Sequence, residues 1–396
     1  MFLWWLLPLV VPATLLAFVA WQIQRRHLTR WLVPYLRERR RRAMPCATQD
    51  IHVLICIADH FEPKAYGADR TRGAARVQHW LQEYPRQFGR FADRDGRPPR
   101  YTFFFPVEEY EPEYLDGLAH LCRAGFGEVE IHLHHADDTA AGFRDKLVSF
   151  RDLLTERHGL LAHHRDSGAV GYAFIHGNWA LCNSRPDGTW CGVNNELAIL
   201  YETGCYADLT YPSAPDPTQP PVINRIYYAH DIPGRSCSHE VAYFLGDGPP
   251  PADALMLIQG PLVLDWRQRK WGVMPRLENG CLQASQPPTI ERLDSWLKAC
   301  VQVPGRPDWY FVKLHAHGAA EDAHGALLGA LMVNFHEALA QRARQNPNFH
   351  YHYVSAREMY NLARAAAAGF RGNVAEALDY EMVSNLAGAP VVGRVS

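Results

Sequence analysis

The sequence predicts an α/β fold with a mainly parallel sheet, and three observations lead to this prediction. Short apolar runs alternate with helical stretches along most of the 396 residues, and strands separated by helix-length crossovers are typical of parallel sheets. The first run, Ile51 to Ala58, reads IHVLICIA, as expected for a strand buried on both faces. The composition, with 47% hydrophobic and 21% charged residues, is that of a folded globular chain.

The expected elements follow one another in a regular order. Runs of strand length lie at 51–58, 101–106, 128–134, 169–175, 309–314 and 350–354. Helical periodicity and closing glycines predict helices at 72–91, 113–124, 142–158, 195–203, 323–345 and 356–367. Between 212 and 288 the sequence is rich in proline, with short β pieces such as 254–258, and we interpret it as an elaborated insertion. The main domain is therefore expected over 49–368, followed by a C-terminal tail over 369–396.

The first segment predicts one transmembrane helix over residues 2–23. No residue from Phe2 to Ile23 is charged, and at about 1.5 Å per residue this run spans roughly 33 Å as a helix, enough for the hydrocarbon core. A cleaved signal peptide would have a basic start and a small-residue cleavage site, and neither is present. Residues 24–48 are expected to form a basic juxtamembrane linker that lies on anionic lipid headgroups.

The charges next to this segment predict its orientation. Eight Arg lie between Arg25 and Arg42, which by the positive-inside rule places the main domain on the cytoplasmic face of a bacterial-type inner (cell) membrane. Nine Cys, an odd number without a CxxC pair, are compatible with a reducing compartment. The net charge of -2 provides no basic field, so no nucleic-acid partner is expected.

Polar side chains follow several predicted strands at the point where each strand ends. They are Asp59, His60 and Glu62 after the first strand, His132, His134, His135 and Asp138 at the third, His176, Asn178 and Trp179 at the fourth, and His315 and His317 at the late strand. Active sites of α/β barrels are built at these strand ends. Alternation along a strand places His132 and His134 on one face, close enough to share one metal ion. The sequence therefore predicts a metal-centred site.

The order of these clusters resembles the polysaccharide deacetylases of the NodB-homology group. The resemblance covers roughly residues 51–367, and HYVSAREM at 352–359 is similar to the family's final strand and helix. It implies a distorted (β/α)7-type barrel and a divalent metal, most often zinc, held by an Asp and two His. It also implies that an activated water attacks an acetyl carbonyl, with an Asp as base and a His as acid. Asp59 matches the metal-binding Asp, His132 the first metal-binding His, and His315 the acid.

The chain departs from the family pattern at three points. Ala58 stands where the family has its base, no Arg aligns to brace that base, and position 136 is Ala where the second metal-binding His is usual. His134 must therefore serve as the second His, with His135 as the fallback ligand. Glu62 is the best substitute base and Asp138 the second choice.

The remaining strand-end residues are expected to contact substrate. They are His60, His176, Asn178, Trp179, Tyr211 and His317, of which Trp179 and Tyr211 could stack on a sugar ring. The predicted function is that of a membrane-anchored, metal-dependent hydrolase that removes acetyl groups from a glycan or a lipid-linked sugar.

Three alternatives stay open. His-Leu-His-His-Ala-Asp lies one residue out of register from the HxHxD motif of metallo-β-lactamase-type hydrolases. Amidohydrolase-like barrels also use His-x-His, although on their first strand. A catalytically degenerate barrel that binds or scaffolds at the membrane is the third alternative, and metal content together with turnover on acetylated sugars would distinguish it from an enzyme.

Overall fold

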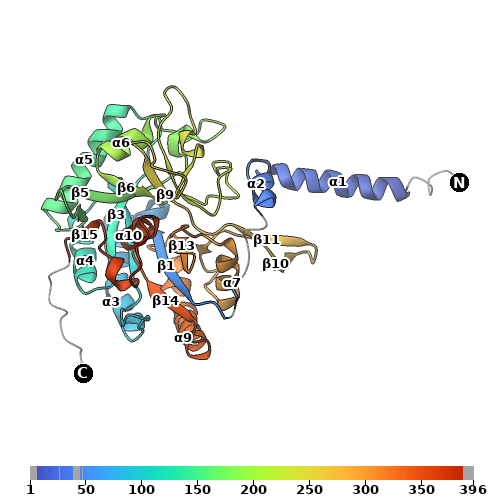
Figure 1. Ribbon diagram of the computed structural model, residues 1–396. Helices are drawn as coiled ribbons and strands as arrows, with labels where there is room; N and C mark the ends of the chain where they lie inside the picture. Colours follow the sequence, from blue (N-terminus) through green and yellow to red (C-terminus); the bar gives the residue numbers. More distant parts are fainter. Residues whose placement is uncertain (1–6, 26, 39–44, 47, 387–396) are drawn as a thin grey trace.

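The structure is a computed structural model, and it describes residues 7–25, 27–38, 45–46 and 48–386. Its centre is a mixed sheet of 13 strands, which curls into a half-barrel with helices around it (Figure 1). The strand order is β12-β13-β1-β2-β3-β5-β6-β9-β7-β8, with β14 beside β1 and with β4 and β15 attached to β5. The predicted α/β fold is thus confirmed.

The elements have the following bounds. The strands of the main sheet are β1 Ile51–His60, β2 Tyr101–Pro106, β3 Gly127–Leu133, β4 Ala162–His164, β5 Val170–His176, β6 Cys205–Asp208, β7 Ile226–Ala229, β8 Tyr243–Phe244, β9 Leu255–Ile258, β12 Cys281–Leu282, β13 Trp309–Ala316, β14 Phe349–Tyr353 and β15 Met382–Ser384; β10 Val263–Lys270 and β11 Met274–Glu278 form a separate hairpin. The helices are α1 Leu7–Arg25, α2 Leu32–Arg37, α3 Arg70–Phe88, α4 Pro112–Arg123, α5 Ala140–Glu156, α6 Glu196–Glu202, α7 Ile290–Ala299, α8 Glu321–Leu327, α9 Ala330–Gln345 and α10 Ala356–Ala367.

The sheet is parallel from β12 to β9, whereas β7 runs antiparallel to both β8 and β9. In the described part of the chain no strand pairing joins β12 to β8, so the sheet forms a half-barrel. The segment 212–288, expected as an insertion, contributes β7, β8, β9 and β12 to this same sheet. It is therefore part of the domain's own architecture.

Apolar side chains pack against both faces of the sheet. Leu54, Cys56 and Ala58 of β1 belong to one core cluster with α10 and the 212–288 segment. Val53 and Ile55, which alternate with them, belong to a second cluster with α3, α4, α5, α7 and α9. We call the side of the sheet that carries α10 the inner face. Because side chains alternate along a strand, consecutive residues of β1 serve opposite faces.

β1 is the central strand and has three partners. β13 pairs with it over His52 to Asp59 along one edge. β14 takes the lower half of the other edge, from Ile51 to Ile55, and β2 takes the upper half, from Ala58 to His60. Directly after β14, a capping box between Ser355 and Glu358 starts α10, which satisfies two backbone donors of the first turn.

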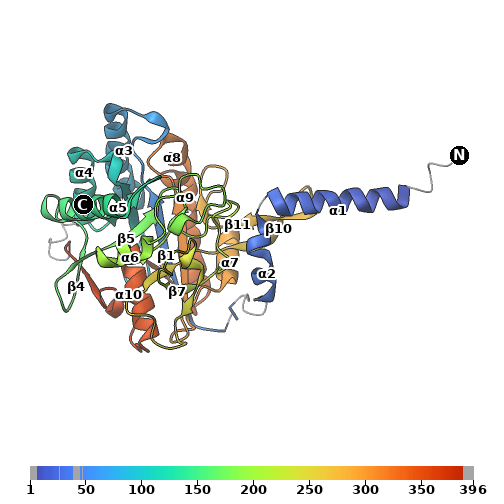
Figure 2. The same ribbon diagram turned by 90° about the horizontal axis from the view of Figure 1, so that it is seen from above.

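The amino-terminal segment differs from the expected anchor. α1 projects away from the domain in both views (Figures 1 and 2). Over the described residues, the structure contains no helix whose length and apolar character would let it cross a membrane. Residues 2–6 of the expected transmembrane helix lie outside the described residues, as do 26, 39–44 and 47 of the expected linker and 387–396 of the expected tail.

Parts of the expected linker and tail belong to the folded domain. Trp31 is 0% exposed and packs with Tyr35 in the inner core cluster, and the Tyr35 hydroxyl accepts a hydrogen bond from Leu264 N at 3.0 Å. These aromatic side chains therefore lie against protein rather than against lipid headgroups. In the expected tail, β15 pairs with β4 in antiparallel register.

Candidate metal centre

His132 and His134 lie at the carboxyl end of β3, and an oxygen acceptor orients each ring. The Nδ1 atom of His132 is 3.1 Å from the carbonyl oxygen of Ile175, and Nδ1 of His134 bonds to the carboxylate of Glu108. Because these oxygens only accept, each Nδ1 carries a proton, and Nε2 is the ring atom that remains to bind either a second proton or a metal ion. Metal-binding histidines are oriented by this kind of contact.

Both Nε2 atoms face the carboxylate of Glu62. Its Oε1 atom lies 3.2 Å from Nε2 of His132 and 3.4 Å from Nε2 of His134. Burial alone would raise the pKa of Glu62, but the bonds with the two rings outweigh burial and hold the pKa far below its usual range. An ionised carboxylate that faces two imidazole lone pairs requires a positive charge, which a ring proton or a metal cation supplies.

His60 completes the group from the end of β1. Its ring centre is 4.7 Å from that of His132, and its buried Nδ1 has no hydrogen-bond partner among the described residues. Burial and the neighbouring imidazoles hold the pKa of His60 well below its usual range, so the ring is neutral. One ligand atom each of His60, Glu62 and His132 lies within 4.8 Å of the others. His134 is not in this set of three, but its Nε2 lies 3.4 Å from the Glu62 carboxylate. Imidazole nitrogens and a carboxylate oxygen are donors that suit zinc.

Asp59, the expected metal ligand, lies on the opposite face of the sheet. Its Oδ1 accepts a hydrogen bond from Gly318 N at 2.7 Å, and the Gly318 carbonyl accepts one from Trp80 Nε1 at 2.9 Å. Its side chain is fully buried, and burial raises its pKa to about 8. A Cβ at Gly318 would lie 2.6 Å from Asp59 Oδ2, so this close contact needs glycine. The structure therefore brings His60, and not Asp59, together with His132 and His134.

Two of the expected residues, His315 in β13 and His317 just after the strand, lie at different depths. His317 lies at the rim, where its ring stacks on His60 with the centres 4.6 Å apart. His315 lies deeper and is 7% exposed, and its Nδ1 has no partner in the described part of the chain. Burial, and then the charge of Lys313, hold the pKa of His315 well below its usual range. Burial lowers the pKa of His317 as well, so our preference for His317 as the acid depends on its position at the rim beside His60.

A second buried group collects three further expected residues away from Glu62. His135 Nε2 lies 3.1 Å and His176 Nε2 3.8 Å from Oε1 of Glu196. The backbone NH of Asn178 donates to His176 Nδ1 at 3.1 Å, so Nε2 carries the ring proton and faces the carboxylate. Asp138 lies at the edge of this group, where Lys146 Nζ donates to it at 2.7 Å. His135, His176 and Asp138 therefore form a hydrogen-bonded support for the adjoining loops.

A cleft of about 800 Å³ opens beside the metal centre. Its lining includes His315, His317 and Trp179 as well as Arg25 and Trp271. The metal centre does not itself line the cleft and adjoins it through His317 and Trp179, which contact His60. Trp179 lies with its ring centre 6.2 Å from His60. Tyr211, expected to stack on a sugar, is 1% exposed instead: its ring stacks on His239 and its hydroxyl donates to the Trp179 carbonyl at 3.1 Å. Tyr211 therefore positions Trp179 and has no free face.

Two acidic residues that sequence reasoning missed follow β2 directly. Glu108 orients His134. Burial alone would lower the pKa of His134, but the hydrogen bonds with Glu108 and Glu62 outweigh burial and raise this pKa to about 10. Without a metal His134 therefore also carries a proton on Nε2, and an ion bound at this centre would take the place of that proton. Burial, and then repulsion from Glu62 and Glu108, raise the pKa of Glu109 to about 7. A search for polar side chains after the predicted strand at 101–106, like the search made at the other strand ends, would have found both.

These findings define a group of three histidines and one glutamate at the carboxyl end of the half-barrel, with an open cleft beside it. No protein-family model matches the chain, and no curated protein matches it either.

Proposed function

We propose that this chain is a metal-dependent hydrolase whose ion is held by His60, Glu62, His132 and His134. One observation carries the proposal: two imidazoles, each fixed at Nδ1 by an oxygen acceptor, direct Nε2 to the same carboxylate oxygen. This arrangement places negative charge and lone pairs around one point, which is how proteins hold divalent zinc-type cations. The ion is most consistent with zinc because the donors are nitrogen and carboxylate oxygen.

When bound, such an ion polarises a carbonyl oxygen and makes water a stronger acid. The chain's own residues supply the proton transfers. We assign Glu109 as the base that replaces the one absent at Ala58. Its carboxylate accepts a hydrogen bond from the backbone NH of Lys64, two residues after Glu62, and its pKa of about 7 suits proton transfer from water at neutral pH. His317, at the rim beside His60, donates a proton to the leaving nitrogen or oxygen.

The substrate class follows from the cleft and from the resemblance to polysaccharide deacetylases. A volume of about 800 Å³ is of the size that holds a small ligand, and Trp179 offers an indole at its inner end. The half-barrel supports a relation to the distorted (β/α)7 barrel of that family. We therefore assign the chain to deacetylation of an acetylated glycan or a lipid-linked sugar.

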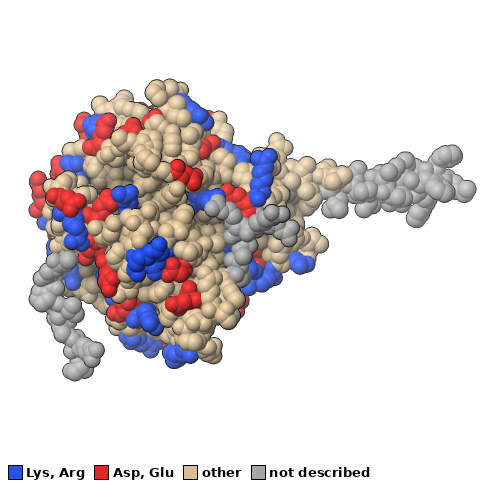
Figure 3. Space-filling model, viewed as in Figure 1, with Lys and Arg blue, Asp and Glu red and all other residues tan. Residues whose placement is uncertain are grey.

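Exposed apolar side chains near the cleft support the proposal that the protein acts at a membrane. Leu16 is 69% exposed on α1, and Trp271 and Val273 are 67% and 71% exposed at the tip of the β10–β11 hairpin. The rings of Phe18 and Trp271 lie 6.0 Å apart, so the two elements form one apolar projection. Elsewhere on the face shown in Figure 3, basic and acidic side chains are interspersed. We propose that this projection inserts into the interface of a cell membrane and presents a lipid-linked substrate to the cleft.

Metal analysis of the full chain tests the metal centre. Replacing His132 and His134 together by Gln is expected to remove the ion from this centre and to abolish turnover on N- and O-acetylated sugars. His120→Gln, an exposed histidine on α4, serves as the matched control. Unchanged metal content in the folded double variant would refute the assignment, and bound metal without any turnover would favour the scaffold alternative.

A further inference from the structure

A second group of histidines lies at the amino end of the sheet, far along the strands from the metal centre. His52 is on β1, and His350 and His352 are on β14, where the parallel register places His52 beside His350. Alternation puts His350 and His352 on one face of β14. The ring of His52 is 4.9 Å from that of His350 and 5.2 Å from that of His352. Three imidazoles thus face one another at a place that the proposed hydrolysis does not use.

A chain of hydrogen bonds fixes the orientation of His52. The carboxylate of Asp95 accepts from Nδ1 of His352 at 2.7 Å, and Nε2 of His352 lies 2.9 Å from Nδ1 of His52. Since His352 gives its Nδ1 proton to Asp95, its Nε2 accepts, and His52 donates from Nδ1. This leaves the lone pair of His52 on Nε2. A carboxylate that orients a ligating imidazole through its distal nitrogen is the usual support of a metal site.

The support is itself rigid. Asp93 Oδ1 accepts from the backbone NH of Asp95 and of Arg97, both at 2.9 Å, and Asp93 Oδ2 accepts from Tyr353 N at 2.9 Å. The turn that carries Asp95 is therefore tied to β14, the strand that carries His352.

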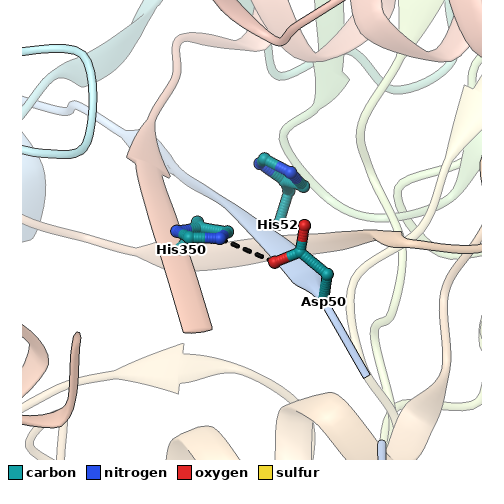
Figure 4. A group of neighbouring side chains, drawn as sticks. All are labelled: Asp50, His52 and His350. Carbon is teal, nitrogen blue, oxygen red and sulfur yellow. Dashed lines mark hydrogen bonds and ion pairs between the residues drawn. The ribbon is translucent and has the colours of Figure 1, made fainter. Parts of the chain in front are cut away.

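Asp50 and His350 complete the group on the solvent side. Nε2 of His350 lies 2.6 Å from Oδ1 of Asp50, as Figure 4 shows. One ligand atom each of Asp50, His52 and His350 lies within 4.8 Å of the others. The side chain of Asp50 is 65% exposed, so an ion can reach the group from solvent.

We infer that Asp50, His52 and His350 form a second metal site, which takes a divalent zinc-type ion. The ion would occupy the place of the proton shared by His350 and Asp50, with Nε2 of His52 as the third protein ligand. Two imidazoles and one carboxylate suit zinc, and the open solvent side leaves room for water as a fourth ligand. His352 and Asp95 are positioning residues. The ligands come from chain segments 300 residues apart, so the ion fastens the first strand of the domain to its last parallel strand.

Zinc titration of the full chain tests this site separately from the hydrolytic centre. The chain is expected to bind two zinc ions, and Asp50→Asn with His350→Gln to bind one fewer, while His132→Gln with His134→Gln loses the other. Asp95→Asn is expected to weaken the second site roughly 10- to 100-fold, as loss of a support carboxylate does. His120→Gln is the control. Circular dichroism and the thermal unfolding midpoint without added zinc check that each variant is folded.

The zinc stoichiometry and affinity of the variants test the second site independently of any hydrolytic activity. Loss of one zinc only in the Asp50 and His350 variant supports the second site, even if no hydrolysis is found. If the chain binds the same zinc with the same affinity after Asp50→Asn and His350→Gln, the second site is wrong, whatever the result at His132. Should the double variant fail to fold, the exposed Asp50→Asn alone decides, because weaker zinc binding is expected and unchanged binding overturns the site.

Discussion

Asp59 and His60 are adjacent in β1, yet they serve opposite faces of the sheet. Asp59 is locked to Gly318 beneath α3 by a 2.7 Å hydrogen bond, whereas His60 lies between His132 and His317 on the inner face. The same strand end thus supplies one structural acid and one candidate metal ligand. The two roles can be separated by mutation.

Asp59→Asn is expected to keep both the fold and the bound metal. Burial raises the pKa of Asp59 to about 8, so the native residue is largely protonated at neutral pH and Asn has nearly the same shape and charge. His60→Gln is expected to lose metal from the same protein. Metal content of the two purified variants checks this, and the reverse result would restore Asp59 as the ligand.

Glu109→Gln is expected to lower turnover about 10²- to 10⁴-fold while metal stays bound, because a general base contributes about this much. The pKa of Glu109 is about 7, and a base acts in its deprotonated form, so wild-type activity should rise with pH through this value. The variant should lack that rise. If Glu109→Gln keeps the wild-type turnover and the same rise of activity with pH, Glu109 is not the base.

His336→Gln is expected to make the protein less sensitive to acid. Burial lowers the pKa of His336 to about 3, below the ordinary unfolded value of about 6.5. Because the unfolded chain takes up this proton at a higher pH than the folded protein does, the folded state loses stability as the pH falls from about 6.5 toward 3. Between pH 7 and pH 4 this group should cost the wild type about 3 kcal/mol in the free energy of unfolding.

Urea unfolding at pH 7 and pH 4 measures this effect as the difference between the wild type and His336→Gln. Gln can still accept the hydrogen bond that Tyr353 makes to His336 Nδ1, 2.8 Å away. His120→Gln should lose stability in parallel with the wild type. Equal acid sensitivity of the wild type and the His336 variant would contradict the prediction.

Trp271→Ser with Val273→Ser is expected to weaken binding to anionic vesicles. Burying a large apolar side chain contributes roughly 1.5–3 kcal/mol, so loss of both should reduce partitioning more than tenfold. Trp190→Ser removes an indole that is 55% exposed elsewhere on the domain and serves as the control. Co-sedimentation with vesicles measures the change, and equal binding of all three proteins would show that the hairpin does not contact lipid.

Local sequence predicted the longer strands and most of the longer helices of the domain because their periodicity is strong. It missed α7 and most of the short strands of the sheet, whose periodic signal is too brief to recognise. It also placed His132 and His134 on one face, since alternation along a strand is a local property. It could not choose between Asp59 and His60, because which of two alternating residues faces inward depends on the partners that β1 finds. The register between β1 and β13 decides which residue faces inward: it pairs Ala58 with His315.

Contacts between residues that are distant in the chain could not be predicted from local sequence. His52 gives no signal within its own strand, and its contact with His352 joins positions 300 residues apart. The break of the expected helix 323–345 into α8 and α9, with Gly329 as the cap between them, could have been read from the sequence, because glycine disfavours a helix interior. Glu108 and Glu109 could equally have been found at the end of β2.

The pairing of β1 with β13 and β14 has a consequence for synthesis on the ribosome. Both lower edges of the first strand are filled by segments that begin at Trp309 and end at Tyr353. β2 can pair early with the upper half of β1, but the lower half stays unpaired in a nascent chain until β13 and β14 have been translated, and open strand edges promote aggregation. The lower half of β1 can therefore find its native partners only after Tyr353 has left the ribosome.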